Sequence, residues 1–104
     1  MKIMVRYKVK ADRAGENERL VKAVFAQLDR ERPAGLRYAT FKLGDGVSFM
    51  HIAIIDTADG SNPLPALEAF KQFSQAIKDR CDELPVTSQL EEVGSYRLFS
   101  GADD

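Results

Sequence analysis

The hydrophobic pattern of this chain changes its period several times, and this change limits the fold more than any other feature. Apolar and charged side chains alternate over residues 2–9, which is the period of a half-buried β-strand. Apolar residues then recur three and four positions apart over residues 20–28, as in an amphipathic helix. The pattern predicts strands over residues 2–9, 36–43, 47–55 and 86–99, a first helix whose apolar stripe spans 20–28, and a second helix over 65–84.

This order of elements, βαββαβ, is typical of the ferredoxin-like α+β fold, a four-stranded antiparallel sheet with two helices on one face. The residues expected at helix ends and turns agree with this order of elements. Asp12 is the expected amino-terminal cap of the first helix, and Pro33 and Pro85 are expected to end the two helices. Asp45 and Gly46 predict a two-residue type I′ turn between the middle strands.

Length and composition limit the class of protein. The 104 residues predict one domain over residues 1–99, followed by a flexible polar tail over residues 100–104. A net charge of −1 argues against a nucleic-acid-binding surface. No apolar stretch resembles a signal peptide or a membrane span, so we expect a cytoplasmic protein without membrane contact. Cys81, the single cysteine, is expected to be an inert buried thiol on the second helix.

The predicted hairpin determines where the only histidine should lie. With a turn at Asp45 and Gly46, residues whose numbers sum to 91 face each other, so Thr40 lies opposite His51. The alternate face of the hairpin is the more apolar one and is expected to pack under the helices; it carries Ala39, Phe41, Leu43, Met50, Ile52 and Ile54. His51 is therefore expected on the open face, away from the monomer core.

The open face should also carry apolar side chains. The same alternation places Met4 and Arg6 of the first strand on this face, and its expected apolar and aromatic side chains are Met4, Tyr38, Phe49 and Tyr96. Exposed apolar patches of this size usually mark an interface or a ligand site. We therefore expect a homodimer in which two sheets pack face to face and enclose a barrel-like cavity.

Three segments carry a resemblance to a known family. The strand "VSFMHIAII", the preceding "RPAGLRYATFKL" and the closing "EVGSYRLF" resemble the dimeric α+β barrel superfamily, in particular the small bacterial antibiotic biosynthesis monooxygenase-like proteins. The resemblance implies a homodimer with a cavity on the open sheet face. Some members of this superfamily oxidise polycyclic phenols without metal or flavin, while others degrade haem, isomerise lactones or have no known activity. Residues 65–84 contain no histidine to ligate haem, and no cofactor or metal is expected.

His51 is the candidate catalytic residue, because an imidazole near its ordinary pKa can exchange a proton with a phenolic substrate at neutral pH. The alternative is a structural histidine that is hydrogen-bonded to Thr40 or to a partner backbone. The expected substrate-binding residues on the same face are Arg6, Tyr38, Thr40, Phe49 and Tyr96.

Arg6 could hold a phenolate oxygen, or it could form an ion pair with Glu91 or Glu92. Tyr38 and Tyr96 could stack on a flat ligand or fill the dimer interface. Two function classes stay open: a cofactor-independent monooxygenase acting on a flat phenolic or quinol-like molecule, and a noncatalytic small-molecule-binding or structural homodimer. A cavity of a few hundred Å³ around His51 would favour the enzyme.

Overall fold

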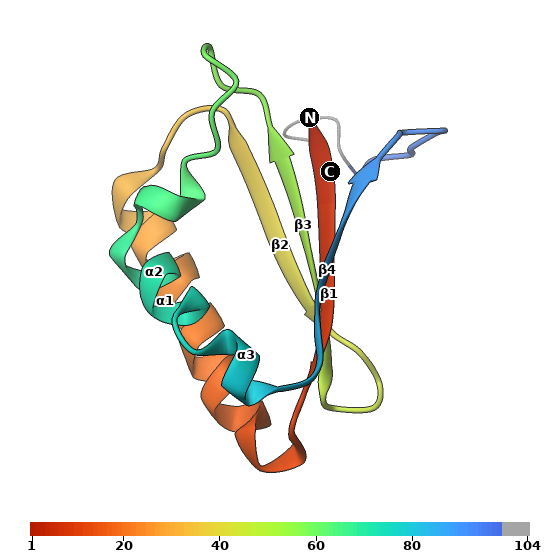
Figure 1. Ribbon diagram of the computed structural model, residues 1–104. Coiled ribbons are helices and arrows are strands. Elements are labelled where there is room, and N and C mark those ends of the chain that lie inside the picture. The colour runs from red at the N-terminus through yellow and green to blue at the C-terminus, as the bar shows by residue number, and fades with distance from the viewer. Residues whose placement is uncertain (99–104) are drawn as a thin grey trace.

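The computed structural model describes residues 1–98 and has the expected ferredoxin-like α+β architecture. The expected tail at residues 100–104 lies outside the described residues. A four-stranded antiparallel sheet has the strand order β2-β3-β1-β4, and the helices cover one of its faces (Figure 1). The elements are β1 (Lys2–Val9), η1 (Ala11–Arg13), α1 (Ala14–Glu31), β2 (Leu36–Lys42), β3 (Ser48–Ile55), η2 (Leu64–Ala66), α2 (Glu68–Ser74), α3 (Ile77–Arg80) and β4 (Cys81–Leu90).

Helix α1 ends as expected but begins differently. A 3₁₀ turn, η1, precedes it and contains Asp12, while Arg13 occupies the cap position without a side-chain cap bond. The expected capping role of Asp12 is therefore wrong. At the other end Arg32 adopts a left-handed conformation with φ 45° and its N–H donates to the carbonyl of Leu28, directly before Pro33.

The hairpin of β2 and β3 has the expected register but a different turn. Thr40 pairs with His51, which confirms that paired numbers sum to 91. The N–H of Gly46 donates to the Leu43 carbonyl at 3.0 Å, so Gly44 and Asp45 are the central residues of the turn, and neither has positive φ. Gly46, which follows them, has φ 77°. A type I′ turn needs positive φ at both central residues, so the expected turn type is wrong. Asp45 instead accepts hydrogen bonds from the N–H groups of Val47 and Ser48.

The second helical segment is shorter than its apolar spacing predicts. Helix α2 stops at Ser74, Ala76 adopts a left-handed conformation with φ 62°, and α3 is a single turn that ends at Arg80. The apolar spacing survives the break because Phe73 and Cys81 are both buried. Cys81 is buried as expected, but it begins β4 instead of lying on a helix, and burial raises the pKa of its thiol.

Strand β4 begins and ends earlier than expected. Pro85 lies inside β4, which is tolerated because β4 is an edge strand and can lack a ladder N–H. The register with β1 shifts on both sides of Lys8. Lys2 pairs with Leu90, so β1 offers no partner to later residues and the strand ends there.

The two faces of the hairpin are exchanged relative to the expectation. Strand β1 places its apolar set under the helices as expected, with Tyr7 and Val9 fully buried. Val5 pairs directly with His51, and antiparallel partners share a face, so His51 also lies under the helices. The more apolar set that includes Phe41, Ile52 and Ile54 lies on the open face instead. The expected position of His51 on the open face is wrong.

Candidate functional site

A buried polar cluster surrounds His51 in the core, between the sheet and the helices. Its ring lies on β3 and is only 5% exposed. The Nδ1 atom lies 2.6 Å from the Tyr38 hydroxyl and 2.9 Å from Thr40 Oγ1, both on β2. The Nε2 atom lies 2.7 Å from the Tyr7 hydroxyl on β1. Both ring nitrogens of His51 thus have partners inside one protomer.

The polar cluster continues from Tyr7 to the far side of the core. Asn17 Nδ2 on α1 donates to the Tyr7 hydroxyl at 2.9 Å. Arg80 Nε donates to Asn17 Oδ1 at 3.2 Å. Asn17 and Arg80 are both buried. A continuous chain of hydrogen bonds therefore crosses the core from Arg80 to Tyr38, and we call it the core polar chain.

Arg80 is positioned by the break between α2 and α3. Its Nη2 donates to the Phe73 carbonyl at 2.7 Å and its Nη1 to the Gln75 carbonyl at 3.4 Å. The last carbonyls of a helix have no intrahelical partner, so the guanidinium satisfies groups that the end of α2 leaves free. The guanidinium also lies over the Phe73 ring, 5.3 Å from its centroid.

A cavity of about 100 Å³ adjoins the His51 end of the core polar chain. Most of its wall is apolar and comes from β1 and from the segment between η2 and α3. Tyr7, Tyr38, His51 and Asn62 supply its polar groups. Asn62 Oδ1 accepts a hydrogen bond from the N–H of Leu64, as expected for a residue that turns the chain before a helix. The cavity therefore combines an apolar wall with a few convergent polar groups, as ligand sites do.

Burial determines the protonation states at this site. Burial lowers the pKa of His51 from its ordinary 6.5 to about 4, so the imidazole is neutral at pH 7. Burial raises the pKa of Tyr38 to about 12, and it raises the pKa of Tyr7 further above its usual value. The expectation that His51 titrates near neutral pH does not agree with its environment. The site offers neutral hydrogen-bonding groups.

The structure brings together some of the expected site residues and separates others. Tyr38 and Thr40 contact His51, and Phe49 is buried beside them with its ring stacked on Tyr7 at a centroid distance of 5.7 Å. Arg6 is exposed on the opposite sheet face.

Tyr96 also lies away from His51. It follows the end of β4 and is 83% exposed. Arg6 was a candidate for an ion pair with Glu91 or Glu92. In the structure the carboxylate of Glu92 instead lies 3.8 Å from Lys2 Nζ.

Sequence reasoning missed three polar members of this site. Asn17 falls on the buried stripe of α1 with Val21 and Val24, and a polar residue on an apolar stripe is a usable signal. Tyr7 alternates with Met4 and Arg6 along the first strand, so the sequence predicts it on the core side, but no sequence feature indicates a role for its hydroxyl. Arg80 could not be found from the pattern, because its burial depends on the break after α2.

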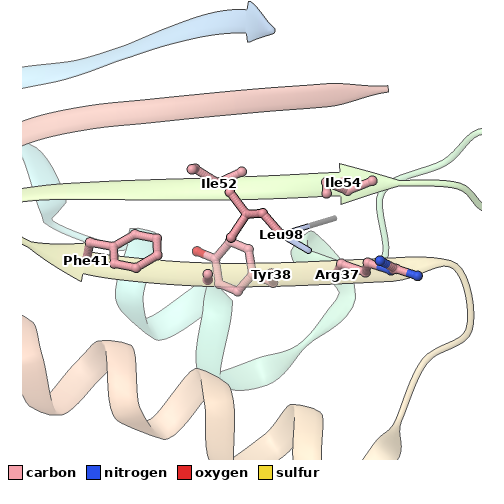
Figure 2. A pocket seen from close by; sticks show the side chains of 7 residues that line it. Arg37, Tyr38, Phe41, Ile52, Ile54 and Leu98 are labelled. Atoms are coloured by element: carbon pink, nitrogen blue, oxygen red, sulfur yellow. The ribbon is translucent and has the colours of Figure 1, made fainter. Parts of the chain in front are cut away.

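The open face of the sheet carries a second, apolar pocket of about 160 Å³. Figure 2 shows Phe41 on β2 and Ile52 and Ile54 on β3, with Leu98 beside them. Phe41 is 49% exposed and Val86 on β4 is 64% exposed. This surface, which we call the open apolar face, is separated from His51 by the sheet itself.

Two further findings concern residues 1–98. Within this range no group of three or more histidine, cysteine, aspartate or glutamate side chains is arranged to hold a metal ion. None of the helices described there is both long and apolar enough to cross a membrane.

The fold defines the class of protein that this chain resembles. A crystal structure of an antibiotic biosynthesis monooxygenase superimposes with a TM-score of 0.72 at 16% identity, covering 89% of this chain and 98% of its own. A provisionally named antibiotic biosynthesis monooxygenase from Bacteroides thetaiotaomicron VPI-5482 gives a TM-score of 0.75 at 14% identity, covering 89% of each chain.

A third similar structure is a mutant form of SnoaB, a cofactor-independent oxygenase from Streptomyces nogalater. Its TM-score is 0.65 at 17% identity, covering 90% of this chain and 93% of that chain. No protein-family model matches the sequence. No curated protein matches it either. The resemblance expected from the sequence is thus confirmed at the level of the fold.

Proposed function

We propose that the chain is a small cofactor-independent oxygenase that oxidises a phenolic or quinol-like ring in the cavity beside His51. The observation that carries this proposal is the convergence of a neutral imidazole and the Tyr38 hydroxyl on an apolar cavity inside one protomer. The similarity in fold to SnoaB, itself described as a cofactor-independent oxygenase, supports it. The proposed site lies under the helices and replaces the expected site on the open sheet face.

The proposed reaction needs only the substrate and molecular oxygen. A phenol with a free para position becomes a quinone when that C–H is replaced by C=O. The substrate gives four electrons to O₂; one oxygen atom enters the new carbonyl, and the other leaves as water with the phenolic and para hydrogens. The phenolate form reacts more readily because it is the better electron donor.

The side chains at this site would stabilise the phenolate. The Tyr38 hydroxyl and the His51 ring can donate hydrogen bonds to a developing oxyanion in a cavity with an apolar wall, where such bonds are stronger than in water. His51 holds no extra proton at neutral pH, because its pKa is about 4. The proton released by the phenol therefore passes to solvent.

The size of the cavity restricts the substrate. Its volume of about 100 Å³ is below the few hundred Å³ typical of ligand pockets. It is also below the roughly 150 Å³ of an engineered protein cavity that binds benzene. A phenolic ring can therefore enter only if a wall side chain moves. The wall contributed by Phe70 and Ile77 belongs to the interrupted helices α2 and α3. We expect single rings to bind more readily than fused rings.

An oxygen-uptake assay tests this function. Purified protein is screened against phenol, naphthols and anthrone-like compounds, with oxygen consumption and ligand-induced thermal stabilisation as readouts. Tyr38→Phe removes a hydroxyl that lines the cavity and should lower turnover by about 100-fold or more, as the loss of one oxyanion donor typically does.

A second variant discriminates between the two sheet faces. Arg6→Gln changes a residue on the open face and should leave turnover unchanged. If Arg6→Gln abolishes turnover while Tyr38→Phe retains it, the site lies on the open face and the present assignment is wrong. Absence of oxygen uptake with every compound would reject the oxygenase proposal.

A noncatalytic binding protein is the second candidate, and a specific observation favours it. The cavity is small, and within residues 1–98 every buried side-chain nitrogen and oxygen has a hydrogen-bond partner. Such a site resembles a satisfied polar core as much as a catalytic pocket. Ligand-induced stabilisation without oxygen uptake would support this candidate.

We also propose that the protein is a homodimer joined through the open apolar face. The helices leave this face of the sheet uncovered, and its exposed members include Phe41 and Val86. An apolar surface of this kind is commonly covered by a partner. In such a dimer each His51 site lies within one protomer, away from the interface.

A further inference from the structure

Each hydrogen bond in the core polar chain has a donor and an acceptor, and their order from Arg80 onward is the direction of the chain. This direction determines which ring nitrogen of His51 carries the proton. We propose that Arg80 sets the tautomer of His51 through Asn17 and Tyr7, so that the imidazole proton lies on Nδ1, facing Tyr38. Arg80 and Asn17 are then positioning residues. The inference depends on the proposed function only in identifying His51 as the group that meets the substrate.

The direction begins at Arg80. A guanidinium group has five N–H donors and no acceptor, so the atom of Asn17 that faces Arg80 Nε must be the amide oxygen. The Asn17 side chain therefore presents its NH₂ group to the Tyr7 hydroxyl, 2.9 Å away. The orientation of the Asn17 amide therefore follows from the fact that the Arg80 guanidinium can only donate hydrogen bonds.

Tyr7 transmits the direction to the imidazole. Its oxygen accepts from Asn17, and its single O–H hydrogen has His51 Nε2 at 2.7 Å as the remaining partner. If Nε2 carried the imidazole proton, Tyr7 would accept two hydrogen bonds and its buried O–H would have no acceptor. Such an unsatisfied buried group is costly enough to favour the other tautomer by about tenfold or more. The proton therefore lies on Nδ1 of His51.

The assigned tautomer determines what His51 offers to a ligand. Its Nδ1–H points toward the hydroxyls of Tyr38 and Thr40, at 2.6 and 2.9 Å. The Nε2 lone pair is occupied by Tyr7 and is not available as a base. The imidazole therefore donates to the Tyr38 hydroxyl, and that hydroxyl is free to donate in turn to a phenolate oxygen.

The experiment uses the fact that His51 is the only histidine in the chain. Protein labelled with ¹⁵N-histidine gives one imidazole in a long-range ¹H–¹⁵N spectrum, and the cross-peak pattern identifies the protonated nitrogen. The ligand-free wild-type protein at pH 7 should show the proton on Nδ1. Asn17→Asp should move it to Nε2, because a carboxylate beside Arg80 accepts from Tyr7 and reverses every later hydrogen bond.

Gln72→Glu is the matched control, since it makes the same amide-to-carboxylate change on the exposed surface of α2 and should leave the proton on Nδ1. A wild-type proton on Nε2 would overturn the inference. So would a folded Asn17→Asp protein that keeps the proton on Nδ1. If Asn17→Asp does not fold, Asn17→Leu removes the amide that donates to Tyr7, so the Tyr7 hydroxyl can either donate to Nε2 or accept from it. This variant should give a mixture of tautomers, and an unmixed Nδ1–H spectrum would then overturn the inference. Because no substrate is present, failure of the oxygenase assay leaves this test unaffected.

Discussion

At the scale of single residues, His51 links stability to protonation. The imidazole is buried and its partners are neutral hydroxyls, so the folded state accepts a proton less readily than the unfolded chain does. The folded pKa of about 4 lies below the ordinary value of 6.5. Between these values the unfolded state binds more protons. The free energy of unfolding must therefore rise with pH across this window.

This linkage predicts a measurable loss of stability in mild acid. Lowering the pH from 7 to 5 should reduce the free energy of unfolding by about 2 kcal/mol, in urea titrations at both pH values. His51→Gln removes the titrating group and should be much less sensitive over the same range. Asp45 does not contribute to this loss, because its pKa is lowered to about 2 from an ordinary 3.8. Equal pH sensitivity in both proteins would show that His51 is not buried as described.

At the scale of elements, the β2–β3 hairpin aligns His51 with Thr40 and Tyr38. Its turn depends on Gly46, whose φ of 77° is unfavourable for residues with a Cβ atom. The space around Gly46 is otherwise open, with no atom within 4 Å of the position that a Cβ would take. A substitution there tests backbone conformation without a steric clash.

Gly46→Val should destabilise the protein by about 1–3 kcal/mol, because a β-branched residue resists positive φ. The matched control is Gly44→Val, in the same turn, where φ is not positive and the space is equally open. Urea unfolding of the three proteins measures the difference. Equal losses in both variants would mean that the turn does not depend on the conformation of Gly46.

At the scale of the whole molecule, the helices cover the less apolar face of the hairpin. The covered face carries the polar side chains of Thr40, His51 and Tyr38. Phe41, Ile52 and Ile54 lie on the open apolar face. A monomer would gain more by burying the more apolar face. The observed arrangement is therefore the one expected if a second copy covers the open apolar face.

Light scattering at micromolar concentration should give about twice the chain mass of 11.6 kDa. Phe41→Glu places a charge on the open apolar face and should shift the mass toward one chain, while circular dichroism remains that of a folded protein. Val93→Glu is the control, because Val93 is 99% exposed, follows β4 and is not among the residues that line the pocket on this face. A wild-type monomer would remove the basis for the dimer.

The sequence alone determined the order of elements, the fold class, the register of the hairpin and the burial of Tyr7 and Cys81. These features depend on local periodicity, and the chain shows that periodicity clearly over most of its length. The end of β4 was not predictable in the same way. A strand continues only while a neighbour pairs with it, and β1 has no residue left to pair beyond Leu90.

Only the tertiary structure decided the two features on which the site depends. Both faces of β3 are apolar, so alternation could not show which face the helices cover; the pairing of Val5 with His51 settles it. The apolar spacing continues across the break after α2. The hydrophobic pattern therefore does not show that Arg80 is buried. The core polar chain exists because Tyr7 on β1, Asn17 on α1 and Arg80 at the end of α3 meet in the folded core. A periodic pattern carries no information about such contacts between elements.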